Sequence, residues 1–299
     1  MKCVLLATCL AAVSFAATSD QFRVNANVVL INATVLDHHD RLVRGLTRDQ
    51  FRLYEDRAEQ RIAYFSEEDT PVSLAVVFDT SGSMLGKLDG MRTALDAILK
   101  DANPGDEFAL VTFANEPRVA ASWSPDAGEI QSRVLLASAH GQTALLDALE
   151  TALGQLKHAR NPRKAILIVS DGGDNYSRAT ERDVMRSLAE TGVQIYAIDN
   201  AEPEYMRERS PEEFEGPDLL ARICDGAGGR YFQVDGQREL SAAAQQISRE
   251  LRSQYVIGYV PSRAERDGRF RHVRVQLNHT AGAPKLSVFW RRGYRAPSY

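Results

Sequence analysis

Two stretches of the chain are apolar at every position and then stop at short polar residues. Residues 74–78 have the sequence LAVVF and are followed by DTSGS, and residues 166–169 have the sequence ILIV and are followed by SDGGD. Such a run is typical of a strand buried on both faces of a parallel sheet. Residues 87–100 then carry apolar side chains at helical spacing. The first run and this helix predict the opening half of a βαβ unit.

The alternation of strand and helix patterns continues to residue 252. Further strands are predicted over 108–113, 118–123, 193–198 and 231–234, and further helices over 127–137, 143–157, 180–190, 218–225 and 239–252. Strands that alternate with helices are typical of a mostly parallel sheet covered on both faces. We therefore expect a doubly wound α/β domain over residues 70–253.

The segments on either side of this domain have β patterns. Strands are predicted over 22–36, 51–54 and 61–65 before it, and over 254–260, 270–277 and 286–290 after it. About three strands are too few to be stable alone. We therefore expect residues 20–68 and 254–296 to pair into one small β-sandwich-like domain, with the α/β domain inserted between its halves.

Residues 1–16 have the pattern of a signal peptide, with Lys2, an apolar run over 4–13 and a small-residue cleavage site. This run is too short to span a bilayer as a helix, and we expect no transmembrane segment elsewhere. The sequence therefore predicts an exported protein, periplasmic or secreted. Cleavage would leave Cys224 as the remaining cysteine, in a helical apolar pattern that predicts a buried thiol.

The formal net charge of −4 hides an asymmetry. Residues 261–299 contain nine lysines and arginines against two acidic residues, so the rest of the chain is acidic. This basic segment could meet an anionic envelope surface or lie beside the acidic remainder. For an exported acidic protein, we expect no nucleic-acid partner.

Short oxygen-bearing side chains stand where the predicted strands end. Asp79, Ser81 and Ser83 follow the first apolar run, Asp171 follows the second, and Thr143 opens a helix after a glycine. Ligands of such sheets bind beyond the carboxyl ends of the strands. Carboxylates and hydroxyls suit Mg²⁺, Mn²⁺ or Ca²⁺ rather than zinc or copper. The alternative is that Asp79 and Ser83 only cap the following helix.

The order of these residues resembles the von Willebrand factor A domain. Its metal-ion-dependent adhesion site uses an Asp-x-Ser-x-Ser motif, a threonine in a later loop and an aspartate after a later strand; all five positions match here, as Asp79, Ser81, Ser83, Thr143 and Asp171. The resemblance implies that the hydroxyls bind the ion directly and the aspartates directly or through water. It also implies that an aspartate or glutamate of a partner protein fills the open coordination position.

Motifs in the flanking segments look like the von Willebrand factor A-related domain of acidobacterial exported proteins. They include Gly258-Tyr259-Val260-Pro261 and Asp267-Gly268-Arg269-Phe270-Arg271. This second resemblance covers nearly the whole chain after the signal peptide, and it implies no defined activity.

We therefore expect a non-enzymatic protein-binding module of the adhesion type that depends on a divalent cation. Two aspartates balance the ion, which leaves it able to accept one more anionic oxygen. One alternative is a metal-dependent hydrolase of the phosphatase type, although Ser81 stands where such an enzyme needs a second carboxylate. Another is a structural envelope protein with a vestigial site. The partner and the oligomeric state stay open.

Two further hypotheses concern regulation. The acidic segment 201–218 should lie on the metal-bearing edge, where one of its glutamates could screen the ion. The last helix, 239–252, runs almost directly into the strand at 254, so a shift of this helix on ligand binding would reach the β domain. A rigid connection is the alternative.

Overall fold

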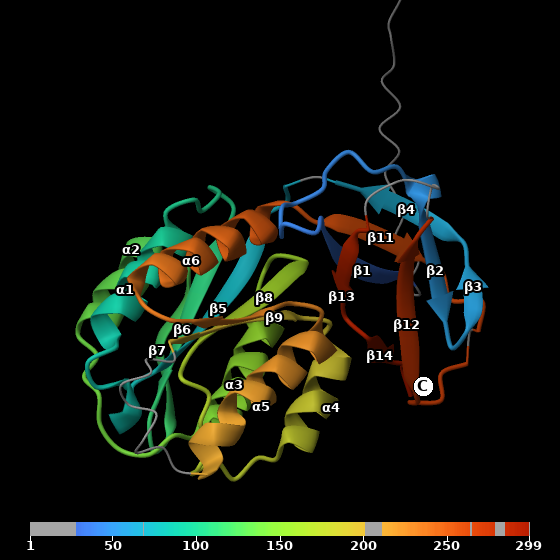
Figure 1. Cartoon of the computed structure of the whole chain (residues 1–299). Coiled ribbons are helices and arrows are strands. Elements are labelled where there is room, and N and C mark those ends of the chain that lie inside the picture. Colours follow the sequence, from blue (N-terminus) through green and yellow to red (C-terminus); the bar gives the residue numbers. More distant parts are fainter. Residues whose placement is uncertain (1–27, 68, 201–210, 264, 279–284, 299) are drawn as a thin grey trace, which may run out of the picture.

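The computed structural model describes residues 28–67, 69–200, 211–263, 265–278 and 285–298. Figure 1 shows two parts side by side, an α/β part and a smaller all-β part. The first and last described strands both belong to the β part, so the α/β part is inserted between two halves of the β part.

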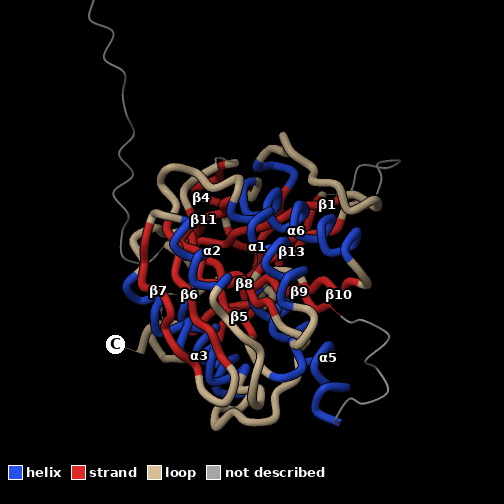
Figure 2. Tube along the Cα trace, turned by 90° about the vertical axis from the view of Figure 1, so that its left-hand side faces the viewer, coloured by secondary structure: helices blue, strands red, loops and turns tan. Residues whose placement is uncertain are grey.

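A six-stranded sheet forms the centre of the α/β part, in the order β10-β9-β8-β5-β6-β7 (Figure 2). Its strands are β5 (Val72–Asp79), β6 (Glu107–Phe113), β7 (Pro117–Ser124), β8 (Arg163–Val169), β9 (Gln194–Asn200) and β10 (Tyr231–Val234). All neighbouring pairs are parallel except β6 with β7. The chain continues from β5 to β6 on one side, and from β8 to β10 on the other. The boundary between β5 and β8 is therefore a topological switch point, where ligands of such sheets bind.

Helices cover both faces of this sheet (Figure 1). One face packs against α1 (Leu88–Leu99), α2 (Ala127–Leu135) and α6 (Gln237–Arg252), and the other against α3 (Leu145–Gln155), α4 (Glu181–Thr191) and α5 (Pro211–Ala227). Alternate residues of β5 serve the two cores, with Val76 and Phe78 in one and Ala75 and Val77 in the other. This explains why the strand is apolar at every position.

The β part consists of two four-stranded sheets, β13-β1-β11-β4 and β14-β12-β2-β3. The strands are β1 (Val29–Leu36), β2 (Phe51–Glu55), β3 (Ala58–Gln60), β4 (Ile62–Ser66), β11 (Tyr255–Tyr259), β12 (Phe270–Leu277), β13 (Ser287–Trp290) and β14 (Gly293–Arg295). Strands from the two ends of the chain pair directly, β1 with β11 and β2 with β12, both antiparallel. Their inward side chains, among them Ile31, Leu53 and Ile257, form one core.

The predicted fold class is confirmed, while some predicted elements are wrong. The helix expected over 218–225 is longer in the structure, where it extends from Pro211 to Ala227 and contains Pro217. In the added part of this helix, Gly216 packs so closely against the backbone of Gly172 and Gly173 that a Cβ would clash there. Strands β3 and β14 were not predicted. Each of these strands has three residues, which is too short for an alternation of apolar and polar positions to be recognised.

Several expectations lie outside the described residues or stay predictions. The signal peptide and residues 201–210 are outside them, so the hypothesis of a screening glutamate remains one. Within the described part of the chain, no helix is long and apolar enough to cross a membrane. Cys224 is buried, as expected, with a free thiol. The domain limits at residues 70 and 253 stay predictions.

Candidate metal centre

The end of β5 shapes its own turn. The backbone N–H of Thr80 donates to the carbonyl of Phe113, which extends the pairing with β6 by one residue (2.8 Å). The next N–H, of Ser81, turns back to Asp79 Oδ1 (2.7 Å). A short 3₁₀ turn, Gly82–Met84, follows and leads into α1. The Asp79 carboxylate therefore fixes the backbone that carries the two serines.

Four of the five predicted residues lie in one connected cluster. Ser81 Oγ lies 3.0 Å from Ser83 Oγ, and Ser83 Oγ donates to Asp171 Oδ1 (3.1 Å). Ser170, which sequence reasoning did not single out, donates from its hydroxyl to Asp79 Oδ2 (2.6 Å). The ends of β5 and β8 thus meet through side chains, as neighbouring parallel strands predict.

Thr143 belongs to a loop that lies against this cluster. The N–H of Gly82 donates to the carbonyl of Gly141 (2.9 Å). This bond joins the loop to the turn that carries Ser81 and Ser83, here called the serine turn. Thr143 is buried, and its N–H donates to Asn175 Oδ1 (2.9 Å), while its carbonyl accepts the N–H groups of Asn175 and Tyr176. The threonine is therefore held between the serine turn and the loop after β8.

The loop needs a glycine at position 141. Gly141 has φ of +80°, in the left-handed region that favours glycine. A Cβ there would also fall against the side chain of Asn115. Asn115 Oδ1 accepts the N–H of Gln142 (2.6 Å), so this asparagine positions the loop from the end of β6.

The cluster holds excess negative charge away from water. Asp79 and Ser81 are fully buried, and Asp171 is nearly so. Burial, together with the nearby Asp171 carboxylate, raises the pKa of Asp79 to about 7. Both causes disfavour the carboxylate form, and a bound cation would counteract both. Positive charge placed in this cluster would therefore stabilise the carboxylate forms.

Lys87 supplies part of that charge, and sequence reasoning missed it. Its Nζ lies 2.9 Å from Asp171 Oδ2, and the two side chains are 3% and 5% exposed. Lys87 stands at the N-cap of α1, where the helix dipole disfavours a cation and capping residues are normally Ser, Thr, Asp or Asn. A lysine at a predicted helix start, next to a candidate acidic site, was the signal available in the sequence.

The structure does not support the simpler capping interpretation. The N-cap residue of α1 is Lys87, without a side-chain cap, and Ser83 Oγ bonds to Asp171 rather than to the helix backbone. The donor set fits a hard cation, because it consists of carboxylate and hydroxyl oxygens. Among the described residues there is no group of three or more His, Cys, Asp or Glu that could hold a metal. A cation held by this cluster would therefore have hydroxyl as well as carboxylate ligands.

Comparison with known proteins places the cluster within a recognised family domain. The family model described as von Willebrand factor type A domain matches residues 74–173, which run from β5 to the loop after β8. The chain is 26% identical over 201 residues to the uncharacterized protein YfbK of Escherichia coli strain K12, and 27% identical over 146 residues to inter-alpha-trypsin inhibitor heavy chain H4 of Bos taurus. These matches cover 64% and 42% of this chain, but only 32% and 16% of those proteins.

Solved structures show the same fold at low identity. Proximal thread matrix protein 1 from the mussel byssus superposes with a TM-score of 0.53 at 20% identity, covering 66% of this chain and 51% of that one. A von Willebrand factor type A protein from Catenulispora acidiphila superposes with a TM-score of 0.51 at 14% identity, covering 91% and 73%. The matched family model thus identifies a von Willebrand factor type A domain within the α/β part of this chain, and these solved structures share its fold.

Proposed function

We propose that this chain is an exported, non-enzymatic module that binds a partner protein through a divalent cation. The presence of a von Willebrand factor type A domain indicates a protein-interaction module. The observation that carries the proposal is the buried oxygen cluster at the switch point of the sheet. The residues proposed to hold the ion, Mg²⁺ or alternatively Mn²⁺ or Ca²⁺, are Asp79, Ser81, Ser83, Thr143 and Asp171.

The chain's own contacts prepare this cluster for binding. Asp79 is oriented by the Ser81 N–H and the Ser170 hydroxyl, and Asp171 by Ser83 and Lys87. These side chains need little rearrangement to receive an ion, so little conformational entropy is lost on binding. A bound ion would supply a coordination position for a carboxylate oxygen of the partner.

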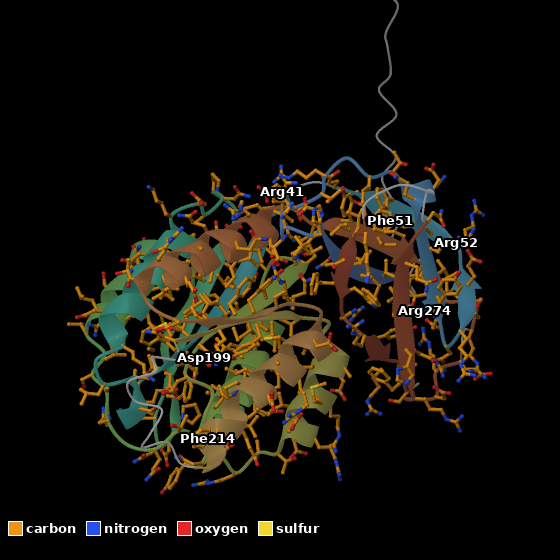
Figure 3. All side chains as sticks on the ribbon, viewed as in Figure 1. Arg41, Phe51, Arg52, Asp199, Phe214 and Arg274 are labelled. Atoms are coloured by element: carbon orange, nitrogen blue, oxygen red, sulfur yellow. The ribbon has the colours of Figure 1, made fainter. Side chains whose placement is uncertain are left out.

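Segments next to the cluster carry exposed apolar side chains. Leu85 follows the serine turn and is 71% exposed, and Tyr176, next to the contact with Thr143, is 55% exposed. Phe214, labelled in Figure 3, is 57% exposed on α5, two residues from the Gly216 contact with Gly172. Exposed apolar groups around a polar centre are typical of protein interaction sites. We infer that the partner presents an acidic side chain flanked by apolar residues.

The contacts of the site favour binding over hydrolysis. Ser81 occupies the place where a phosphatase of the aspartyl class needs its acid or base. The histidine of the loop before Thr143 is His140; its backbone N–H donates to the carbonyl of Thr80 (2.8 Å), and its Nδ1 lies 2.9 Å from the carbonyl oxygen of Ser138. The ring of His140 therefore contacts its own loop, while its backbone is bonded to the residue after Asp79. Two surface depressions of about 560 and 400 Å³ lie elsewhere, beside α4 and on the β2–β12 sheet.

Affinity capture from an envelope extract tests the proposal. The wild-type chain should retain a partner in Mg²⁺ and release it in chelator, whereas Asp79→Ala should retain none in either condition. Asp96→Ala is the matched control, because Asp96 is an exposed aspartate on α1. Equal capture by wild type and Asp79→Ala would contradict the proposal. Turnover of phosphoesters by the wild type alone would favour the hydrolase instead.

A further inference from the structure

We propose that Lys87 is a resident second cation of the metal site. In this proposal, which rests on the proposed function, Lys87 keeps the metal-loaded site positive until a partner carboxylate neutralises it. Lys87 thereby weakens binding of the metal alone and strengthens binding of the carboxylate.

The two oxygens of Asp171 face different neighbours. Oδ1 accepts a hydrogen bond from Ser83 Oγ (3.1 Å), on the side of the serine and Asp79 cluster. Oδ2 lies 2.9 Å from Lys87 Nζ. A divalent ion among the hydroxyls would therefore use the Oδ1 side of Asp171, and Lys87 can keep the Oδ2 side.

The position of Lys87 is fixed by the backbone around it. Its N–H donates to the carbonyl of Met84 (3.0 Å), and its carbonyl accepts the N–H of Met91 (3.1 Å). These bonds tie the residue to the serine turn on one side and to the first turn of α1 on the other. The side chain is buried, so the ammonium group cannot exchange Asp171 for water without exposing buried structure.

A lysine in this place runs against local preference. The amino end of a helix carries partial positive charge, and burial of an ammonium group costs free energy. Asp171 compensates both effects through a close ion pair. Residues that break a local rule are expected at functional sites, so the position points to a role in the site rather than in the helix.

The charges of the site predict how Lys87 changes the affinity for the ion and for the partner carboxylate. Asp79 and Asp171 together carry two negative charges, which a divalent ion alone would balance. With Lys87 the metal-loaded site keeps one positive charge, and one partner carboxylate brings the sum to zero. Because the site is buried, a unit charge has a larger effect there than at the surface.

Titration calorimetry with Mg²⁺ tests this on the full chain. The variant Lys87→Gln removes the charge but keeps a donor to Asp171, and Lys87→Met removes both. Either should bind Mg²⁺ about tenfold more tightly than the wild type. Lys100→Gln, at an exposed position at the end of the same helix, is the matched control and should bind like the wild type. If one Lys87 variant fails to fold, the other gives the answer.

Acetate serves as the probe for the second half of the proposal. With Mn²⁺ bound, the wild type should take up acetate at least fivefold more tightly than Lys87→Gln, measured by the relaxation of the acetate protons. Equal Mg²⁺ affinity in all variants would overturn the role of Lys87 and leave the proposed function standing. Absence of cation binding in the wild type and in both variants would overturn both.

Discussion

The Asp79 carboxylate sits where a negative charge is unfavourable. It is fully buried, and its pKa is raised by desolvation and by Asp171. Its two oxygens accept from the Ser81 N–H and the Ser170 hydroxyl, which compensates the burial in part. A residue selected for fold stability alone would not be an aspartate here. The proposed cation would account for its presence.

Replacing Asp79 by asparagine should therefore separate stability from binding. We expect Asp79→Asn to raise the melting temperature of the metal-free chain by about 2–4 °C, because the buried charge is removed while one acceptor is kept. The stabilisation that Mg²⁺ gives to the wild type should be lost. Thermal unfolding at pH 8, with and without Mg²⁺, measures both. A variant that Mg²⁺ stabilises as much as the wild type would contradict the account, and Asp96→Asn is the control.

The Thr143 hydroxyl can be tested as a metal ligand by a smaller change. The variant Thr143→Val keeps the shape of the side chain and removes its hydroxyl. Mg²⁺ affinity should fall about tenfold, because a neutral ligand is lost, while the contacts of the Thr143 backbone with Asn175 are kept. Calorimetry gives the affinity and circular dichroism checks the fold. Unchanged affinity would remove Thr143 from the proposed ligand set.

Residues at the site were predictable to different degrees. Asp79, Ser81 and Ser83 form a local pattern, and Thr143 and Asp171 were found because they follow apolar or glycine signals. Lys87 and Ser170 act through partners 84 and 91 positions away in the sequence. Such pairings depend on which strands are neighbours, and no local pattern carries that information.

The carboxyl end of α6 is held by buried polar contacts. The Arg163 guanidinium, on β8, donates to the carbonyl of Leu251, and Arg252 pairs with the buried Asp106 at 2.7 Å. Moving the helix along its axis would break both contacts at once. These contacts therefore favour the rigid connection over a sliding last helix.

The variant Arg163→Met tests this clamp. It leaves the carbonyls of Thr70 and Leu251 without their guanidinium donor, so we expect a loss of about 3 kcal/mol in the free energy of unfolding. Arg133→Met on α2, where the arginine makes an exposed pair with Glu129, should change it by less than about 1 kcal/mol. Urea unfolding measures both. Equal small effects would show that the end of α6 is not clamped.

Long elements were easier to predict than short ones. The strands β5 and β8 and the helix α4, which ends at Gly192 with φ of +65°, have clear patterns and stop signals. In the part of α5 that was not predicted, Gly216 packs against Gly172, which lies far away in sequence. Tertiary packing overrode the local signal of Pro217 there.

At the scale of the molecule, the site lies at the carboxyl ends of the parallel strands, and the β part joins the α/β part at the opposite ends. The β part joins the α/β part where β5 begins and where α6 ends, while the site lies where β5 and β8 end. The two parts also touch through the backbone of Gly228, after α5, and that of Trp290 and Arg291. These connections restrict motion between the parts, and none of them involves the residues of the proposed metal site.

The Gly228 contact can be tested by a single methyl group. Gly228 has φ of +77°, and a Cβ there would clash with the backbone of Trp290 and Arg291. We expect Gly228→Ala to lower the free energy of unfolding by about 2–4 kcal/mol. Gly154→Ala, in α3 with open space around it, should instead raise it by about 0.5–1 kcal/mol. A neutral Gly228→Ala would show that the two parts are less tightly joined.

In the proposed site, oxygens from three loops hold one divalent ion at the end of β5. A crystal of the full chain soaked in Mn²⁺ and measured at a wavelength where manganese scatters anomalously tests this most directly. The account predicts one strong peak within coordination distance of Ser81, Ser83 and Asp171. A map with no peak there, or with manganese only at other positions, would contradict it.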